Sequence, residues 1–452
     1  MIPSPVRGLA AALVLMGAAT SAAAQSASSV NFPFETYRLE NGLRVVLAPD
    51  RNTPVVAVNL WYDVGSRNER QGRTGFAHLF EHMMFEGSAN APKGDHSRLL
   101  QGAGATGLNA STAEDRTNYY QVVPPNRLNL ALWLESDRMR SLKVEPAQLA
   151  NQQEIVKEER RLRVDNAPYT RSLLAATSTG LYSTEGCFPY AHEVIGSMDD
   201  LNAARIEDVQ QFFRTYYAPN NATLTLVGDF DPAAARQMVQ QYFGGIPRVE
   251  TPPRPECPQP FSGLPRRDTI SDPNATLPAF MAAYGSVAVG DKDSYALDLL
   301  SVILGGGRSS RLNQRLVRTE RAAAFAVTQS DTRRGPGVFL VHVRANPGVD
   351  AARLETITDE EIARIVREGV TEAELSRARN QYRARFVRTL QTAMGKAETL
   401  QRYALYFDDP AALRTDLDRY LAVSVADVNR VARQYLTPQN RAVVITLPGR
   451  TQ

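Results

Sequence analysis

A proline-rich segment near the middle of this 452-residue chain sets the strongest limit on its fold. It runs from residue 247 to 265 and includes the sequence TPPRPECPQP at 251–260. Proline has a fixed φ and no backbone N–H, so this segment is incompatible with a regular helix or a central strand and favours an extended linker. Because the chain is longer than one ordinary domain, we place a domain boundary there. We expect an N-terminal domain at 25–246, a linker at 247–265 and a C-terminal domain at 266–452.

The two sides of this linker share a predicted order of elements. On the first side, β-branched and aromatic residues predict a strand within 54–64, ahead of an apolar helix within 75–87. On the second side, a strand predicted at 279–284 precedes a helix predicted at 293–304. This recurrence indicates an internal repeat of two similar units, each of which contains helices and strands. The second of these helices has no histidine pair, which predicts a non-catalytic copy.

The helix predicted within 75–87, GFAHLFEHMMFEG, carries two histidines and a carboxylate among apolar residues. His78 and His82 are four residues apart, so their imidazoles lie on successive turns and can bind one ion. Glu81 lies close to them around the helix axis. The apolar neighbours indicate a buried helix, in which polar groups need an internal partner. Only five histidines occur in the chain, and two at ligand spacing favour a metal ion as that partner.

Two histidines are too few for a catalytic zinc site, which usually has three protein ligands and an open position for water of pKa about 7. The acid-rich helix predicted over 151–161 is the candidate source of the third ligand. Glu81 then remains available to accept a proton from the water and pass it to a leaving amine. We expect the isolated histidines to have structural or solvated positions, with one in a loop: His96, His192 and His342.

The N-terminus has the pattern of a secretion signal. Arg7 precedes an apolar run at 9–19, and three alanines at 22–24 precede Gln25, which predicts cleavage after residue 24. No later stretch is apolar and long enough to span a bilayer. We therefore expect a protein without membrane insertion in an extracytoplasmic space, most simply a bacterial periplasm.

Charge and cysteine content limit the partners and the covalent structure. With 51 basic and 48 acidic residues the chain has no global field that would attract nucleic acid, so we exclude nucleic acid as a partner. In an oxidising compartment Cys187 and Cys257 could form a disulfide. Cys257 lies in the linker, however, and sequence cannot give the pairing geometry, so the pairing stays open. Glu114 and Asp115 are predicted to be charges of a hairpin turn.

Several segments together are typical of one protein family: HLFEH at 78–82, GLNAST at 107–112, TNYY at 117–120, VKEER at 156–160 and LGGGRSSRL at 304–312. They resemble the pitrilysin-type zinc peptidases, especially the group that contains mitochondrial processing peptidase and its bacterial relatives. This resemblance spans nearly the whole chain after the signal. It implies an α+β fold in which two homologous α/β domains, each a mostly antiparallel sheet covered by helices, enclose a clam-shell chamber. It also implies a zinc-dependent endopeptidase that hydrolyses peptides or unfolded segments.

The resemblance assigns roles to residues of the metal site. One zinc ion per chain would be held by His78 and His82, with Glu81 as the general base. The third ligand of the family is a glutamate that aligns with Glu159, and the adjacent Glu158 is the fallback.

The resemblance also bears on substrate and partners. Asn109 and Ala110 match positions of an edge strand that pairs with an extended peptide, although an ordinary sheet strand is equally compatible with these residues. Gln152 stands where the family often has a second glutamate, and we expect it to alter ligand basicity more than to abolish metal binding. Members of this length often pair, so we expect a homodimer or a heterodimer with a homologue that lacks the zinc motif. Two other functions stay open: a non-catalytic assembly or scaffold subunit, and a processing peptidase dedicated to one precursor.

Overall fold

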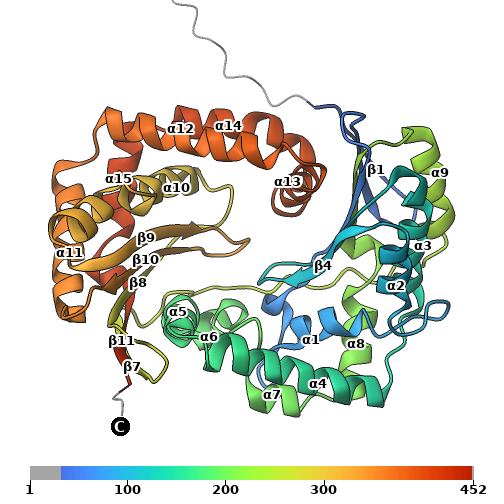
Figure 1. Cartoon of the computed structure of the whole chain (residues 1–452), viewed down its shortest axis with the longest axis horizontal. Coiled ribbons are helices and arrows are strands. Elements are labelled where there is room, and N and C mark those ends of the chain that lie inside the picture. The colour runs from blue at the N-terminus through green and yellow to red at the C-terminus, as the bar shows by residue number, and fades with distance from the viewer. Residues whose placement is uncertain (1–31, 450–452) are drawn as a thin grey trace, which may run out of the picture.

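The structure is a computed structural model that describes residues 32–449, and the predicted signal at 1–24 lies outside these residues. The fold is α+β with two separate sheets, as expected (Figure 1). The first sheet has the order β1-β2-β6-β3-β5-β4. Its strands are β1 (Glu35–Arg38), β2 (Arg44–Pro49), β3 (Val56–Tyr62), β4 (Thr106–Thr112), β5 (Thr117–Val123) and β6 (Ala222–Gly228). The second sheet has the order β7-β11-β8-β10-β9. Its strands are β7 (Arg266–Asp272), β8 (Ala279–Gly285), β9 (Ala323–Asp331), β10 (Val338–Ala345) and β11 (Arg441–Pro448).

Helices cover both sheets. The helices before the linker are α1 (Phe76–Met83), α2 (Asp95–Gly102), α3 (Leu128–Ser141), α4 (Pro146–Arg160), α5 (Thr170–Thr177), α6 (Thr184–Cys187), α7 (Met198–Asn202), α8 (Ile206–Tyr216) and α9 (Pro232–Phe243). Those after it are α10 (Lys292–Gly305), α11 (Ala351–Glu368), α12 (Glu372–Thr389), α13 (Ala393–Tyr406), α14 (Leu413–Ala422) and α15 (Val425–Tyr435). Among residues 32–449, no helix combines the length and the apolar character that crossing a membrane requires.

Apart from the additional edge strand β1, the first sheet has the same topology as the second, which confirms the predicted repeat. Each sheet is antiparallel except for one parallel pair, β2 with β6 in the first and β7 with β11 in the second. In each half a helix follows the strand that lies beside the last strand of that half. Helix α1 follows β3, which lies beside β6, and α10 follows β8, which lies beside β11. The edge strands β4 and β9 also correspond, and both are directed toward the space between the two halves (Figure 1).

One helix from each half packs on the sheet of the other half. Helix α13 packs on β3 and β6, where Ala397 and Leu400 contact a core face formed by Val46, Ala57 and Val227. Helix α5 packs on β8 and β11 in the same way. Every residue of β3 is therefore buried, although a sheet with only one covered face would alternate buried and exposed residues. The linker divides the sequence but not the packing of these two helices.

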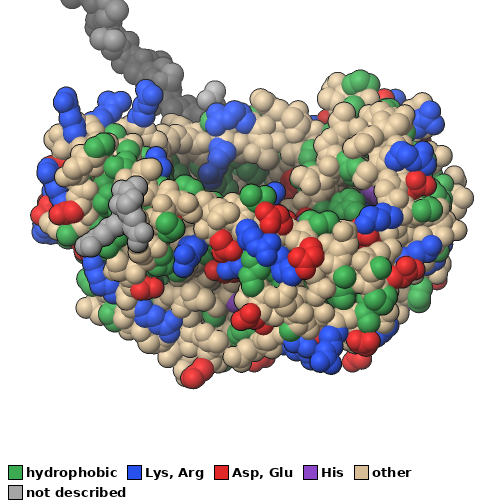
Figure 2. Space-filling view, turned by 60° about the horizontal axis from the view of Figure 1, so that its bottom comes forward, with side chains coloured by type: hydrophobic (Ala, Val, Ile, Leu, Met, Phe, Trp, Pro, Cys, Tyr) green, Lys and Arg blue, Asp and Glu red, His purple; other side chains and the backbone are tan. Residues whose placement is uncertain are grey.

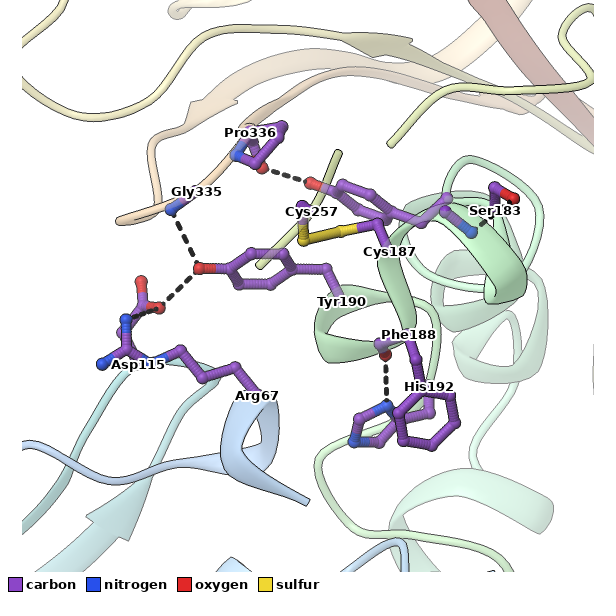
Figure 3. The surroundings of a disulfide bond; sticks show 12 residues. Arg67, Asp115, Ser183, Cys187, Phe188, Tyr190, His192, Cys257, Gly335 and Pro336 are labelled. Atoms are coloured by element: carbon purple, nitrogen blue, oxygen red, sulfur yellow. Dashed lines mark hydrogen bonds and ion pairs between the residues drawn. A yellow bond between two sulfur atoms is a disulfide. The ribbon is translucent and has the colours of Figure 1, made fainter. Parts of the chain in front are cut away.

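The halves also meet through their edge hairpins (Figure 3). The turn between β4 and β5 carries Asp115, which is buried, not solvated as a turn charge would be. Its carboxylate accepts hydrogen bonds from the Tyr190 hydroxyl at 2.7 Å and the Arg334 backbone N–H at 2.8 Å, and it pairs with Arg67 at 3.3 Å. The Tyr190 hydroxyl in turn accepts the Gly335 N–H at 2.9 Å. A buried charge network thus fixes the two hairpin turns to each other.

The open question about the cysteines is answered by a disulfide between Cys187 and Cys257 (Figure 3). It attaches the proline-rich linker to α6, three residues before Tyr190 in the hairpin network.

Acidic and basic side chains are interspersed on the face of the molecule shown in Figure 2, in agreement with the small net charge of +3.

Several elements differ from the expectations. His96 lies on α2, not in a loop, and is buried with its Nε2 3.7 Å from the Glu135 carboxylate. Residues 313–319 form a π-helix, which the sequence does not indicate. Strand β9, with the sequence AAFAVTQSD, lacks the β-branched run by which a strand is recognised. Strand β7, RRDTISD, is a polar edge strand and shows no apolar pattern.

Candidate metal centre and active site

Helix α1 is fixed at its N-terminus by a buried glutamate. Glu69 accepts hydrogen bonds from the backbone N–H groups of Gly75 at 2.8 Å and Ala77 at 2.7 Å, where the helix dipole favours a negative charge. His192 lies 3.1 Å from the same carboxylate and so has a structural role, as expected. Gly75 has φ +84°, and a Cβ atom there would lie 2.6 Å from the Ile195 carbonyl oxygen. The close approach of the loop that contains Ile195 therefore requires a glycine at residue 75.

Three predicted ligands converge beside this helix. The imidazole rings of His78 and His82 have centroids 4.8 Å apart. Oε2 of Glu159, on α4, lies 3.6 Å from His78 Nε2 and 3.2 Å from His82 Nε2. One donor atom from each residue lies within 4.8 Å of the other two. The structure therefore brings together two residues of one helix and a third from a helix more than seventy residues further along the chain.

The two adjacent glutamates of α4 face different surroundings. The Glu159 side chain is 16% exposed and its second oxygen pairs with Arg163 at 2.7 Å. The Glu158 side chain is 57% exposed and pairs with Arg161 at 2.9 Å, away from the histidines. Neighbouring helical residues differ by about 100° around the axis, so only one of the two can face α1. Arg163 belongs to a π-helix at 161–165 that continues α4, and sequence reasoning missed it.

Glu81 lies on the same face of α1 and touches the edge strand of the sheet. Its carboxylate accepts a hydrogen bond of 2.5 Å from the hydroxyl of Thr112 on β4. Burial raises the pKa of Glu81 above its ordinary value, and the Thr112 hydrogen bond acts against that rise. A carboxylate with a raised pKa beside a metal-binding set has the character of a general base. Thr112 lies in the GLNAST segment at 107–112, but the sequence alone gave it no role.

The donor set has the chemistry that zinc requires. Burial and the charge of His82 lower the pKa of His78 to about 4, so its imidazole is neutral and keeps a free lone pair at pH 7. His78 Nδ1 is buried and has no hydrogen-bond partner. For His82 burial acts to lower the pKa, but the hydrogen bond that His82 donates to Glu159 and the charge of Glu159 outweigh that effect and raise the pKa. Two imidazoles and a carboxylate in contact form one of the ligand sets of catalytic zinc.

Gln152 contacts His82 at Nδ1, the ring nitrogen that does not face Glu159. Its Oε1 lies 3.2 Å from His82 Nδ1, and its Nε2 donates a 2.5 Å hydrogen bond to the carboxylate of Glu86. Glu86 is buried and pairs with Lys93 at 2.8 Å. An acceptor at Nδ1 fixes the tautomer of His82 that leaves Nε2 free toward Glu159. Gln152 thus lies in contact with a candidate ligand, while Glu86 and Lys93 were not anticipated from the sequence.

The predicted substrate residues lie on the edge strand β4. Asn109 is exposed and Ala110 is buried, and β4 pairs with β5 alone among the described strands. The register of this pair shifts between Thr106 and Asn109. The Ala110 N–H donates to the Asn109 Oδ1 at 2.9 Å. The other edge of β4 has no strand partner among the described strands.

Two family models match the chain, one in each half. The model described as Insulinase (Peptidase family M16) matches residues 44–183, and the model described as Peptidase M16 inactive domain matches residues 204–382. The second match agrees with the lack of a histidine pair in α10.

Relatives extend over almost the whole chain. Zinc protease PqqE of Helicobacter pylori is 30% identical over 433 residues, which cover 95% of this chain and 96% of that protein. The crystal structure of a protease from Helicobacter pylori matches with a TM-score of 0.86 at 28% identity, over 92% of this chain and 100% of that one. The periplasmic protease PqqL from Escherichia coli has the same fold, with a TM-score of 0.76 at 20% identity over 93% of this chain and 48% of that one. On the metal-binding set, the repeated sheets and these similarities, the chain belongs to peptidase family M16, the pitrilysin-type zinc peptidases.

Proposed function

We propose that this chain is a zinc-dependent endopeptidase that cleaves peptides or unfolded segments. The observation that carries the proposal is the convergence of His78, His82 and Glu159 within 4.8 Å of one another, with Glu81 on the same helix face. A non-catalytic subunit would have no need of such a set. One zinc ion held by these three residues would act as a Lewis acid and lower the pKa of water.

The chain's own residues divide the remaining work. Glu81 takes a proton from water and delivers it to the leaving amine, and Thr112 orients its carboxylate through the 2.5 Å hydrogen bond. Gln152 keeps His82 in the tautomer whose Nε2 faces Glu159. The edge of β4 at Asn109 and Ala110 binds the substrate as an added antiparallel or parallel strand through main-chain hydrogen bonds.

Compartment and assembly belong to the same proposal. We place the protein in a bacterial periplasm, which the predicted signal at 1–24 and the disulfide support. A closed space between the two halves would restrict substrates to extended chains. A homodimer, or a heterodimer with a homologue that lacks the zinc motif, is the proposed assembly, and light scattering on the purified chain distinguishes the homodimer from a monomer.

The experiment measures metal content and peptide cleavage on the same preparation. The expected result is about one zinc per chain and cleavage of unstructured peptides that a chelator abolishes and added zinc restores. Cleavage that persists after complete removal of metal would refute the zinc mechanism. Stoichiometric zinc without any cleavage across a broad peptide library would instead favour the non-catalytic subunit.

A further inference from the structure

The C-terminal half contains a cavity of about 480 Å³ at the position that corresponds to the metal site. Residues of α10, β9, α12, α13 and α14 line it. In the N-terminal half α1, β4 and α4 surround the metal-binding set, and α10, β9 and α12 occupy the matching places in the chain order (Figure 1). The repeat therefore has a second potential site, whose chemistry has changed.

Matching hydrogen bonds fix the alignment of the two halves. The Asn221 side chain donates to the backbone oxygen of Asp63, directly after β3. The Asn440 side chain donates to the backbone oxygen of Gly285, at the end of β8. Each asparagine also donates to the carbonyl at the end of the preceding helix, at 2.9 Å in both halves. Asp63 and Gly285 are thus equivalent.

From this alignment the sheet registers identify the counterpart of Thr112. Tyr62 on β3 and Thr112 on β4 both pair with the same residue of β5. In the second sheet Tyr284 on β8 and Ser330 on β9 both pair with one residue of β10 in the same way. Ser330 is therefore the counterpart of Thr112. Ser330 lies beside Asp298 of α10, as Thr112 lies beside Glu81 of α1. A carboxylate next to an edge-strand hydroxyl is thus retained in both halves.

The third metal ligand is replaced by a group of opposite charge. Helices α4 and α12 both begin after a residue that forms a capping box, Glu145 and Thr371. Counted from these residues, Glu159 and Arg385 hold the same helical position. Arg385 lines the cavity together with Arg402 of α13. Tyr295 and Leu299 stand in the places of His78 and His82, so all three zinc ligands are replaced, and the guanidinium groups of Arg385 and Arg402 suit an anion.

The cavity lining holds charges of both signs: Arg385 and Arg402, and the carboxylates of Asp298, Asp331 and Asp416. Within residues 32–449, neither Arg385 nor Arg402 has a carboxylate within ion-pair distance. Asp416 is 4% exposed; its Oδ2 accepts a 2.5 Å hydrogen bond from the Tyr403 hydroxyl, but its Oδ1 has no partner. Aromatic rings form much of the remaining wall: Tyr295, Tyr382, Phe386, Phe407 and Tyr420.

We propose that this cavity binds a carboxylate, as found in a free amino acid or in the C-terminal residue of a peptide. Arg385 and Arg402 bind the carboxylate. The aromatic wall packs against the side chain, and the volume suits a ligand of one or two residues. This binding site is separate from the metal site, and its occupation does not require peptide hydrolysis.

The test compares a peptide acid with its amide. The full chain is freed of metal with a chelator, so that neither cleavage nor metal coordination of the carboxylate contributes. Fluorescence anisotropy then measures binding of an N-terminally labelled peptide with a free C-terminal carboxylate and of the same peptide as C-terminal amide. The variants are Arg385→Gln and Arg402→Gln, and the control is Arg377→Gln, an exposed residue of α12 outside the cavity.

The expected result is that the parent and Arg377→Gln bind the acid about 10- to 100-fold more tightly than the amide, as for a charge-assisted contact. Arg385→Gln and Arg402→Gln should each lose most of this preference while binding the amide as before. Displacement of the peptide by free amino acids identifies these as ligands, and lack of displacement identifies the peptide terminus. Equal affinity of the parent for acid and amide, or a preference that survives in both arginine variants, would overturn the proposal.

Discussion

A single oxygen-for-nitrogen exchange at Gln152 tests how the surroundings of the metal site are built. Gln152 lies between His82 and the buried carboxylate of Glu86, with its Nε2 2.5 Å from Glu86 Oε1. In the Gln152→Glu variant two carboxylates would meet there. Two unit charges about 4 Å apart repel by about 4 kcal/mol at an effective dielectric constant of 20, which corresponds to about three pKa units. The introduced carboxyl group therefore retains a proton near neutral pH and changes zinc affinity little.

A charge exchange relieves that repulsion. In the double variant Gln152→Glu with Glu86→Gln, a carboxylate at position 152 faces His82 Nδ1. On its other side this carboxylate faces an amide at position 86. An ionised acceptor makes the imidazole a stronger ligand, and changes of this kind alter metal affinity by about 10- to 100-fold. We expect the double variant to bind zinc about tenfold more tightly than Gln152→Glu at pH 7.

Competition with a chromophoric zinc chelator between pH 6 and pH 8.5 measures both effects. The raised pKa of the introduced group means that the single variant is neutral at low pH and gains its charge as pH rises, so its affinity should approach that of the double variant at the upper end. Gln153→Glu is the control, because Gln153 donates instead to the backbone of Leu201. If the single and double variants bind zinc equally at every pH, the interaction between Gln152 and Glu86 does not govern this site.

Three further outcomes follow from the geometry. Glu159→Gln should lose zinc by metal analysis and Glu158→Gln should keep it, since only the first side chain faces the histidines; zinc loss in Glu158→Gln alone would reverse the assignment. Thr112→Val removes the hydrogen bond that holds down the pKa of Glu81, so the acidic limb of the rate–pH profile should move up by about one unit, whereas Thr112→Ser should leave it in place. Cys187→Ser, which breaks the disulfide, should lower the free energy of unfolding by about 2–4 kcal/mol in urea; an unchanged midpoint would mean that the linker is held without it.

Local patterns in the sequence predicted much of the N-terminal site. Helix α1 was predictable because its histidine spacing and apolar surface are properties of one short segment. The choice between Glu158 and Glu159 depended on the rotation of α4 about its axis, which family resemblance could align but periodicity could not. The contact of Gln152 with Glu86 joins residues 66 apart in the chain, and no local pattern encodes it.

The parts that sequence did not predict are those held by long-range packing. Helix α13 lies on the sheet of the other half, and the bond from Gln401 to the Asn59 backbone spans 342 residues. The buried state of Asp115 depends on Tyr190 and Arg334 from distant segments. Strand β9 carries alanines and polar residues because it lies at a sheet edge, so its composition does not indicate a strand.

The most direct test of the central claim is the rate of peptide cleavage by zinc-loaded Glu81→Gln. This change keeps the shape of the side chain and its contact with Thr112 but removes the group that accepts the proton. The account predicts unchanged zinc content and a rate about 10²- to 10⁴-fold below that of the parent. Cleavage at the parental rate by a fully zinc-loaded Glu81→Gln chain would contradict it.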